Sequence, residues 1–131
     1  LLDVCSRWAF AWATAKIDTL KSIRFLKGAV RQAPFLFKTL QSDHGSEFSR
    51  RFTTRMLVQG ISHRHSRVRT PTDNGHLERF NRTIQQECLS KIPHSLKSWD
   101  REIPEYLRYY NTERPHMALN YKTPLEVVRS Y

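Results

Sequence analysis

The stretch Ser42-Asp43-His44-Gly45-Ser46-Glu47-Phe48 follows an apolar run at residues 35–40. A second stretch, Asn74-Gly75-His76-Leu77-Glu78-Arg79-Phe80-Asn81, lies further along the chain. The first places an aspartate at the end of a predicted strand, with a glycine close behind it. The second places a glutamate in the first turn or so of a strongly patterned helix. A third carboxylate, Asp3, lies almost at the N-terminus. The predicted fold and function depend mainly on these two stretches and on Asp3.

The composition is that of a globular, basic protein. The chain has 131 residues, which predicts one domain, and 39% of them are hydrophobic, enough to offset the entropy of an ordered chain. The net charge is +10, from 22 Lys and Arg against 12 Asp and Glu. Such an excess favours a polyanionic partner, because neutralising phosphates releases counterions. The alternative is a basic surface without a partner.

The cysteines and the hydropathy favour the cytoplasm. Cys5 and Cys88 form no CxxC or zinc-finger pattern, which favours reduced core thiols rather than a disulfide. No apolar run approaches about 18 residues, so no membrane span is predicted. The chain begins without Met, inside the apolar run Leu1-Leu2, and we expect it to be cut from something longer.

The first half of the chain predicts strands interrupted by helices. An antiparallel meander is expected, with a strand at residues 1–5 that carries Asp3 and either one strand or two short ones at 8–15. Asp18 or Thr19 can cap a helix that runs to about Gln32, before Pro34. The remaining expected elements are a mostly buried strand at 35–41, a short helix after Phe48 that Gly60 ends, a short strand at 61–65 and a loop at 66–73. The strand at 8–15, the helix to about Gln32 and the strand at 35–41 predict a crossover and a parallel pair.

The second half predicts helices. One begins near Asn74 with Thr72 or Asp73 as its cap, and its buried stripe is Leu77, Phe80, Ile84 and Cys88. Ser98 is expected to cap the next, in which Pro104 marks a kink or a later start. A loop at 112–121 and a half-helix after Pro124 complete the chain.

Three oxygen-bearing side chains on two strands and a helix suit metal chemistry. Divalent magnesium takes carboxylate ligands and keeps positions for water and phosphate. Two such ions can activate a nucleophile and stabilise the leaving oxygen of an in-line displacement at phosphorus. The chain has 12 acids, however, so any three prove little on their own. Others are better interpreted as helix caps and flanks (Asp18, Asp73, Asp100) or as solvated positions (Glu87, Glu102, Glu105, Glu113).

Four segments together resemble the superfamily of retroviral integrases and bacterial insertion-sequence transposases. They are Asp3-Val4-Cys5-Ser6-Arg7, the stretch at 42–48, the stretch at 74–83, and the tail Tyr110-Asn111-Thr112-Glu113-Arg114-Pro115-His116-Met117-Ala118-Leu119 with Lys122-Thr123-Pro124. They occur in the family's order and cover essentially the whole chain. His44 stands where the family often has Asn or Arg, and only Leu1 and Leu2 precede the first aspartate.

The resemblance implies a fold, a site and a reaction. The fold is α/β and RNase H-like, a mixed five-stranded sheet flanked by helices, with its first strand truncated here. Residues 1–111 would be the catalytic core and 112–131 its C-terminal tail. Asp3, Asp43 and Glu78 would be the DDE triad, both catalytic and metal-binding, for Mg²⁺ or Mn²⁺, with two ions expected. The reaction is metal-dependent cleavage of DNA followed by strand transfer.

The expected partners follow from that reaction. They are DNA, as element ends and as target, and further copies of the same chain; neither a membrane nor a small-molecule cofactor is expected. The location would be the bacterial cytoplasm, in association with the nucleoid. Candidate DNA contacts are Arg64, Arg67, Arg69, Asn74, His76, Arg79 and Arg82. The alternative for the first three is a solvated edge strand and loop, and for His76 a surface histidine at the start of a helix. Arg114-Pro115-His116 is expected to lock the tail onto the core rather than to touch DNA.

Other functions stay open at this point. An RNase H-like nuclease would need the same acids but would only hydrolyse DNA. A non-catalytic DNA-binding remnant of a decayed element, or an inactive fragment, would need only the basic surface. A small helix-turn-helix binder is disfavoured, because it has no place for the predicted strands around Asp3 and Asp43.

Overall fold

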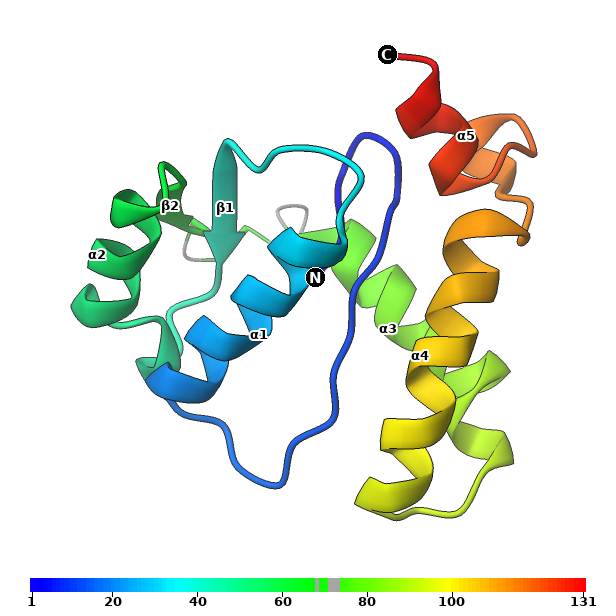
Figure 1. Cartoon of the computed structure of the whole chain (residues 1–131), viewed down its shortest axis with the longest axis horizontal. Coiled ribbons are helices and arrows are strands. Elements are labelled where there is room, and N and C mark those ends of the chain that lie inside the picture. The colour runs from blue at the N-terminus through cyan, green and yellow to red at the C-terminus, as the bar shows by residue number, and fades with distance from the viewer. Residues whose placement is uncertain (68, 71–73) are drawn as a thin grey trace. The chain divides into compact units, whose positions relative to one another are not determined.

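A computed structural model describes residues 1–67, 69–70 and 74–131. The chain forms two compact units: Leu1–Thr14 joins Gly75–Tyr131 in the first, and Ala15–Asn74 forms the second. Figure 1 shows the elements of each unit. No helix of the described residues is long and apolar enough to cross a bilayer.

The unit of residues 15–74 is a small α/β layer. Its elements are α1 (Thr19–Gln32), β1 (Thr39–Ser42), η1 (Ser46–Phe48), α2 (Arg50–Val58) and β2 (Ser62–His65). β1 and β2 are parallel, in register from Thr39 opposite Ser62 to Ser42 opposite His65, and α2 makes the crossover. This parallel pair differs from the predicted one, which joined the strands at 8–15 and 35–41 across the helix that ends near Gln32. The buried side chains include Leu26, Phe52 and Met56.

Local signals set the helix ends in this unit. Asp18 Oδ1 accepts a hydrogen bond from Lys21 N at 2.8 Å and caps α1, as predicted. Gly60 follows α2 with φ +74°, a left-handed conformation that costs glycine little. The buried side chains of α1 are Ile23, Leu26 and Ala29, whereas Leu20 is 50% exposed.

The predicted buried strand at 35–41 is wrong in its first half. β1 begins only at Thr39, and Leu36 is 90% exposed. Phe35 and Phe37 stack on each other, with ring centroids 5.5 Å apart. Alternation along an extended chain then turns Leu36 the other way, toward solvent.

The other unit joins an N-terminal hairpin to the C-terminal helices. Leu2 pairs with Ala9 in an antiparallel bridge, and Asp3 N donates to Trp8 O at 2.8 Å. The helical elements are α3 (Gly75–Glu87), η3 (Leu89–Lys91), α4 (Leu96–Thr112), η4 (Met117–Leu119) and α5 (Pro124–Arg129). Their apolar cluster consists of Ala9, Phe80, Ile84, Cys88, Ile103, Tyr106, Leu107 and Tyr110.

Asn111 holds the hairpin against these helices. Its side chain accepts from Ala9 N and donates to Ala9 O, each at 2.8 Å, and it is itself buried. An asparagine amide therefore pairs with Ala9 as a neighbouring strand would. Because Asn111 ends the buried stripe of α4, the N-terminal residues are fixed to an element far away in the sequence.

Three expectations in this unit need correction. α4 begins at Leu96 with Ser95 as its cap, not at Ser98, and continues through Pro104, because a long buried stripe outweighs one missing hydrogen bond. Leu77 is exposed, so the buried stripe of α3 starts at Phe80. Cys5 is exposed, although Cys88 is buried as predicted.

The sheet is smaller than expected. Among the described residues the only sheet is the two-stranded pair β1–β2, and the predicted strands at 1–5 and 8–15 reduce to the Leu2–Ala9 bridge. Arg7, with φ +64°, turns the chain back within a few residues, which leaves room for a very short ladder. The half-helix after Pro124 is confirmed as α5, with a capping box between Thr123 and Glu126.

The pairing of Asn111 with Ala9 gives a stability prediction. Asn111→Asp keeps the shape but replaces the donor to Ala9 O with a negative oxygen, in a buried place. We expect the free energy of unfolding to fall by about 2–4 kcal/mol in urea titrations. The same change at exposed Asn120 is the control and should stay within about 0.5 kcal/mol. Equal small effects at both sites would contradict the role of Asn111.

Candidate functional site

Asp43 is the first residue after β1, and its position is set by several hydrogen bonds. Its Oδ1 accepts from Gly45 N at 2.9 Å, while its backbone carbonyl accepts from Ser42 Oγ and His65 Nδ1, each at 2.9 Å. The side chain is exposed, and the bond to Gly45 does not use Oδ2. Asp43 therefore presents a carboxylate oxygen to solvent from a fixed backbone.

The Glu47 side chain lies close to Gly45. A Cβ at this position would lie 2.6 Å from Glu47 Oε2 and 2.7 Å from Glu47 Oε1. The Glu47 carboxylate thus occupies the space of a side chain at position 45. Gly45 itself has an ordinary φ of −58°, so a larger residue at this position would require only that the end of the Glu47 side chain move.

Three histidines surround the end of β1. The rings of His44 and His65 stack with centroids 4.9 Å apart, and His63 meets His65 edge-on at 4.8 Å. His63 Nε2 lies 2.8 Å from Ser42 Oγ, and His63 Nδ1 lies 2.7 Å from Thr53 Oγ1 in α2. Burial and the charge of His65 lower the pKa of His63. The end of β1 is therefore held by neighbouring imidazoles as well as by the strand ladder.

Asp3 is fixed within the turn of the N-terminal hairpin. Its Oδ2 accepts from both Ser6 N and Ser6 Oγ, each at 2.7 Å, and its backbone carbonyl accepts from Arg7 N at 2.9 Å. Ser6 is buried, so this arrangement is shielded from water on one side. These bonds do not use Oδ1, and the carboxylate is half-buried.

Glu78 lies in the first turn of α3 and is exposed. The helix begins at Gly75 with Phe80 and Ile84 buried, which turns Glu78 outward. Thr72 and Asp73, the predicted caps, lie outside the described residues. Asp3 and Glu78 belong to one unit and Asp43 to the other. No three His, Cys, Asp or Glu side chains form a metal-binding group among the residues that the structure describes within either unit, so the triad stays a prediction.

The candidate DNA contacts are mostly exposed. Arg64 lies on β2, and Arg67 and Arg69 follow it; Arg69 adopts φ +57°. On the other unit His76, Arg79 and Arg82 are exposed along α3, while Asn74, just before it, is half-buried. These side chains stay candidates for contacts to phosphates, the kind of contact that positions a protein on DNA.

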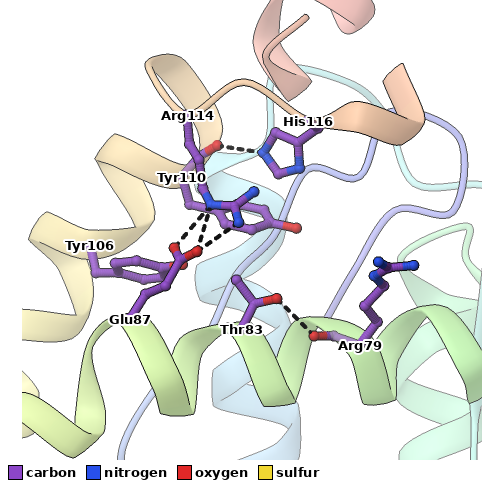
Figure 2. Close-up of polar contacts among 7 residues, drawn as sticks. All are labelled: Arg79, Thr83, Glu87, Tyr106, Tyr110, Arg114 and His116. Atoms are coloured by element: carbon purple, nitrogen blue, oxygen red, sulfur yellow. Dashed lines mark hydrogen bonds and ion pairs between the residues drawn. The ribbon is translucent and has the colours of Figure 1, made fainter. Parts of the chain in front are cut away.

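Arg114 and His116 lock the tail onto the helices, as predicted (Figure 2). Arg114 Nη2 lies 2.6 Å from Glu87 Oε1, and Arg114 Nε donates to both carboxylate oxygens at 3.0 and 2.9 Å. Tyr106 OH donates to Glu87 Oε2 at 2.6 Å. His116 Nε2 lies 3.1 Å from Tyr110 O. The expectation that Glu87 is a solvated residue is wrong, because its partner lies in the tail.

This network shifts the pKa values of its members. Burial alone would raise the pKa of Glu87, but the hydrogen bonds from Arg114 and Tyr106 and the charge of Arg114 outweigh it, and the net pKa lies below the usual value of 4.5. Burial raises the pKa of Tyr110 to about 12. Burial also lowers the pKa of His116, which favours a neutral ring that donates from Nε2 to the Tyr110 carbonyl.

Sequence reasoning missed Ser6, Asn111 and Glu87 as supports of the site. Ser6 lies three residues after Asp3, a spacing typical of a side-chain turn, and this local signal could have identified it. The partners of Asn111 and Glu87 are 102 and 27 residues away, and no local pattern points to them.

The whole chain is similar to integrases and transposases. Two models described as "Integrase core domain" match residues 1–71 and 59–124. The transposase of insertion sequence IS904 from Lactococcus lactis is 30% identical over 128 residues, which cover 94% of this chain and 51% of that protein. The transposase InsD of the IS2 elements of Escherichia coli is 30% identical over 142 residues, covering 98% of this chain and 46% of that protein. The chain thus spans about half the length of these relatives.

Solved structures share the fold. A simian T-cell lymphotropic virus intasome in complex with PP2A regulatory subunit B56 gamma matches with a TM-score of 0.81 at 20% identity, over 96% of this chain and 45% of that one. The catalytic core domain of BIV integrase matches with a TM-score of 0.72 at 18% identity, over 98% and 83% of the two chains. The chain therefore has the RNase H-like α/β fold of such cores.

The pair of Glu87 and Arg114 gives a pH prediction. A carboxyl whose pKa is lowered on folding stabilises the protein above its unfolded pKa, and that contribution disappears as the pH falls through the folded value. Glu87→Gln should therefore cost about 1 kcal/mol at pH 7, and its difference from the wild type should shrink as the pH falls below 4.5.

Urea titrations across this pH range measure the effect. Glu105→Gln is the control, since Glu105 meets Arg108 at 3.7 Å in a pair that is largely exposed. Its cost should stay below about 0.5 kcal/mol at every pH. A Glu87→Gln difference that is flat with pH would contradict the assigned role of the ion pair.

Proposed function

Because the chain belongs to the integrase core domain family, whose models match residues 1–71 and 59–124, we propose that it is the catalytic core of a DDE transposase. Asp3, Asp43 and Glu78 form its triad. Residues 1–111 are the core, and 112–131 are the tail that Arg114 fastens. The proposal includes the mixed five-stranded sheet of the RNase H-like fold. Cleavage and strand transfer would take place on bacterial DNA in the cytoplasm, at the nucleoid.

The observation that carries the proposal is how Asp3 and Asp43 are presented. In each residue one carboxylate oxygen is held by local donors, Ser6 in one case and Gly45 in the other. The second oxygen of each takes no part in these bonds, and Glu78 is exposed on the first turn of α3. Carboxylates on fixed backbones suit a role that needs defined ligand directions.

The donor set fits a hard divalent cation. All three groups are carboxylates, and Mg²⁺ and Mn²⁺ take oxygen ligands readily. When bound, one or two such ions supply activation of a hydroxyl nucleophile and stabilisation of the leaving oxygen. Asp3, Asp43 and Glu78 would hold them, with Ser6 and Gly45 fixing the ligand orientation.

The reaction would proceed in two in-line displacements at phosphorus. In the first, water attacks a phosphodiester at the element end, and the bond from phosphorus to the 3′ oxygen breaks to leave a free 3′-hydroxyl. In the second, that hydroxyl attacks a target phosphodiester, its oxygen bonds to the phosphorus, and the bond from phosphorus to the target's 3′ oxygen breaks to leave a 3′-hydroxyl on the target. The chain's residues bind and orient both DNA segments, and no covalent protein intermediate forms.

The charge distribution supports DNA as the substrate. Residues 15–74 contain 12 Lys or Arg against 4 Asp or Glu, a net charge of +8 out of +10 for the whole chain. Exposed Arg64, Arg67 and Arg69 follow one another closely at the end of this unit. Action on two ends and a target at once would require a homo-oligomer, which we include in the proposal.

The triad is tested by neutral substitutions that keep the shape of each side chain. Asp3→Asn, Asp43→Asn and Glu78→Gln should each lower end cleavage and strand transfer by at least about a hundredfold in Mg²⁺ or Mn²⁺. The assay separates joined from nicked DNA on a gel. Asp100→Asn, an exposed acid on α4, is the matched control and should keep full activity.

The same assay separates the alternatives. Cleaved DNA without any joined strand would favour an RNase H-like nuclease. A non-catalytic remnant would be favoured by a protein that binds DNA but does not cleave it. Such a protein should also show no metal binding that Asp43→Asn abolishes. Full activity in the Asp43→Asn or Glu78→Gln protein would overturn the triad.

The basic residues make a separate prediction about binding. Removing one cation that neutralises a phosphate should lower the slope of log K against log salt by about 0.9. Arg64→Gln and Arg67→Gln together should therefore reduce the slope by about 2, measured with duplex DNA in EDTA so that cleavage plays no part. Arg101→Gln combined with Arg108→Gln is the control, because both arginines lie on α4, outside the proposed DNA contacts, and the net charge falls equally. Equal slopes for the two double variants would contradict the proposed binding of DNA by Arg64 and Arg67.

A further inference from the structure

We propose that His63 is a positioning residue for Asp43, acting through a chain of hydrogen bonds from α2 to the backbone that follows β1. The inference rests on the proposed function, because it matters for catalysis only if Asp43 is a catalytic ligand. These hydrogen bonds link Thr53 in α2 to His63 in β2, and His63 to Ser42 at the end of β1.

The strand register brings these groups together. His63 is opposite Leu40 in the parallel pair, and Ser42, two residues beyond Leu40, emerges on the same face of the strand. His63 Nε2 lies 2.8 Å from Ser42 Oγ, and Nδ1 lies 2.7 Å from Thr53 Oγ1. One imidazole therefore bridges the end of β1 and the helix that covers the strands.

The donor and the acceptor of each of these hydrogen bonds can be assigned. The hydroxyl of Ser42 donates to Asp43 O at 2.9 Å, so Ser42 Oγ accepts from His63 Nε2–H. The unprotonated Nδ1 then accepts from the Thr53 hydroxyl. Thr53 Oγ1 also lies 3.4 Å from Ser49 O, a longer contact than its 2.7 Å to His63, and a single neutral tautomer of His63 satisfies the bonds to Ser42 and Thr53.

Packing holds the ring in this orientation. His63 meets the ring of Phe52 edge-on at 5.0 Å, and Phe52 is 1% exposed. A second donor, His65 Nδ1, reaches the same carbonyl of Asp43 at 2.9 Å, and Ser66 N donates to Ser42 O at 2.7 Å. The peptide that carries the Asp43 side chain is thus restrained from β2 and, through His63, from α2.

Stability alone gives little reason for an imidazole at this position. An apolar ring would pack against Phe52 without the cost of burying two polar nitrogens. Both nitrogens instead form hydrogen bonds, Nε2 with Ser42 and Nδ1 with Thr53. Because ligand misplacement by about 1 Å can cost about a hundredfold in rate, restraint of this peptide has a direct catalytic use.

The test compares His63→Phe with His63→Gln. Phenylalanine keeps the ring and its packing on Phe52 but removes both hydrogen bonds, whereas the glutamine amide can again donate to Ser42 Oγ. With supercoiled or end-bearing DNA and Mg²⁺, we expect kcat for cleavage to fall about tenfold or more in His63→Phe. DNA affinity in EDTA should be unchanged, and His63→Gln should recover most of the rate. Thr53→Val, which keeps helix and shape, should lower kcat in the same direction.

A second measurement does not depend on activity. Nitrogen-15 NMR of the histidines in the metal-free chain should show His63 as the neutral Nε2–H tautomer at pH 7, and Thr53→Val should shift its Nδ1 resonance. His94→Phe, at a histidine that packs on Trp99, is the control for ring replacement and should change neither rate nor tautomer.

The outcomes separate this inference from the function beneath it. If Asp43→Asn is fully active, the proposed triad fails first. If Asp43→Asn is inactive but His63→Phe cleaves as fast as the wild type, only the positioning role is overturned. An Nδ1–H tautomer, or a glutamine variant as slow as the phenylalanine variant, would also overturn it.

Discussion

The pairing of Asn111 with Ala9 is the interaction on which the first unit depends. That unit is assembled from Leu1–Thr14 and Gly75–Tyr131, two segments that the chain separates widely. The amide of Asn111 satisfies both backbone groups of Ala9, and Ala9 in turn pairs with Leu2. The turn that holds Asp3 follows directly from this bridge. One buried side chain on α4 thus determines where the N-terminal carboxylate can lie.

The candidate site uses polar side chains for orientation and apolar ones for support. Ser6 fixes one oxygen of Asp3, and the Gly45 amide fixes one oxygen of Asp43. Each unit also has almost fully buried apolar residues, Ala9 in one and Phe52 in the other. Hydrophobic contacts bring the backbone to the right place but leave a carboxylate free to rotate. Directional bonds then remove that freedom, which is the pre-organisation that in-line chemistry at phosphorus demands.

Features with a local cause could be predicted from the sequence. The Asp18 cap of α1, the end of α2 at Gly60 and the capping box of α5 each depend on residues within one turn. The family motifs likewise identified Asp3, Asp43 and Glu78 as candidates. Features that depend on residues far away in the sequence could not be predicted. In the sequence alone, Asn111 and Glu87 look like ordinary helix residues, because their partners are distant along the chain. The short sheet and the exposed Leu36 were missed for the same reason: strand length depends on which neighbours pair.

The direction of Glu78 is set at the opposite end of its helix. Glu78 and Glu87 are nine positions apart, and at about 3.6 residues per turn they lie on opposite sides of α3. Glu87 is held by Arg114 and Tyr106, and the buried stripe from Phe80 to Cys88 flanks it. Once that side is fixed, α3 cannot rotate about its axis, and Glu78 must face outward. The C-terminal tail, which contains Arg114, therefore determines how Glu78 of the proposed triad is presented.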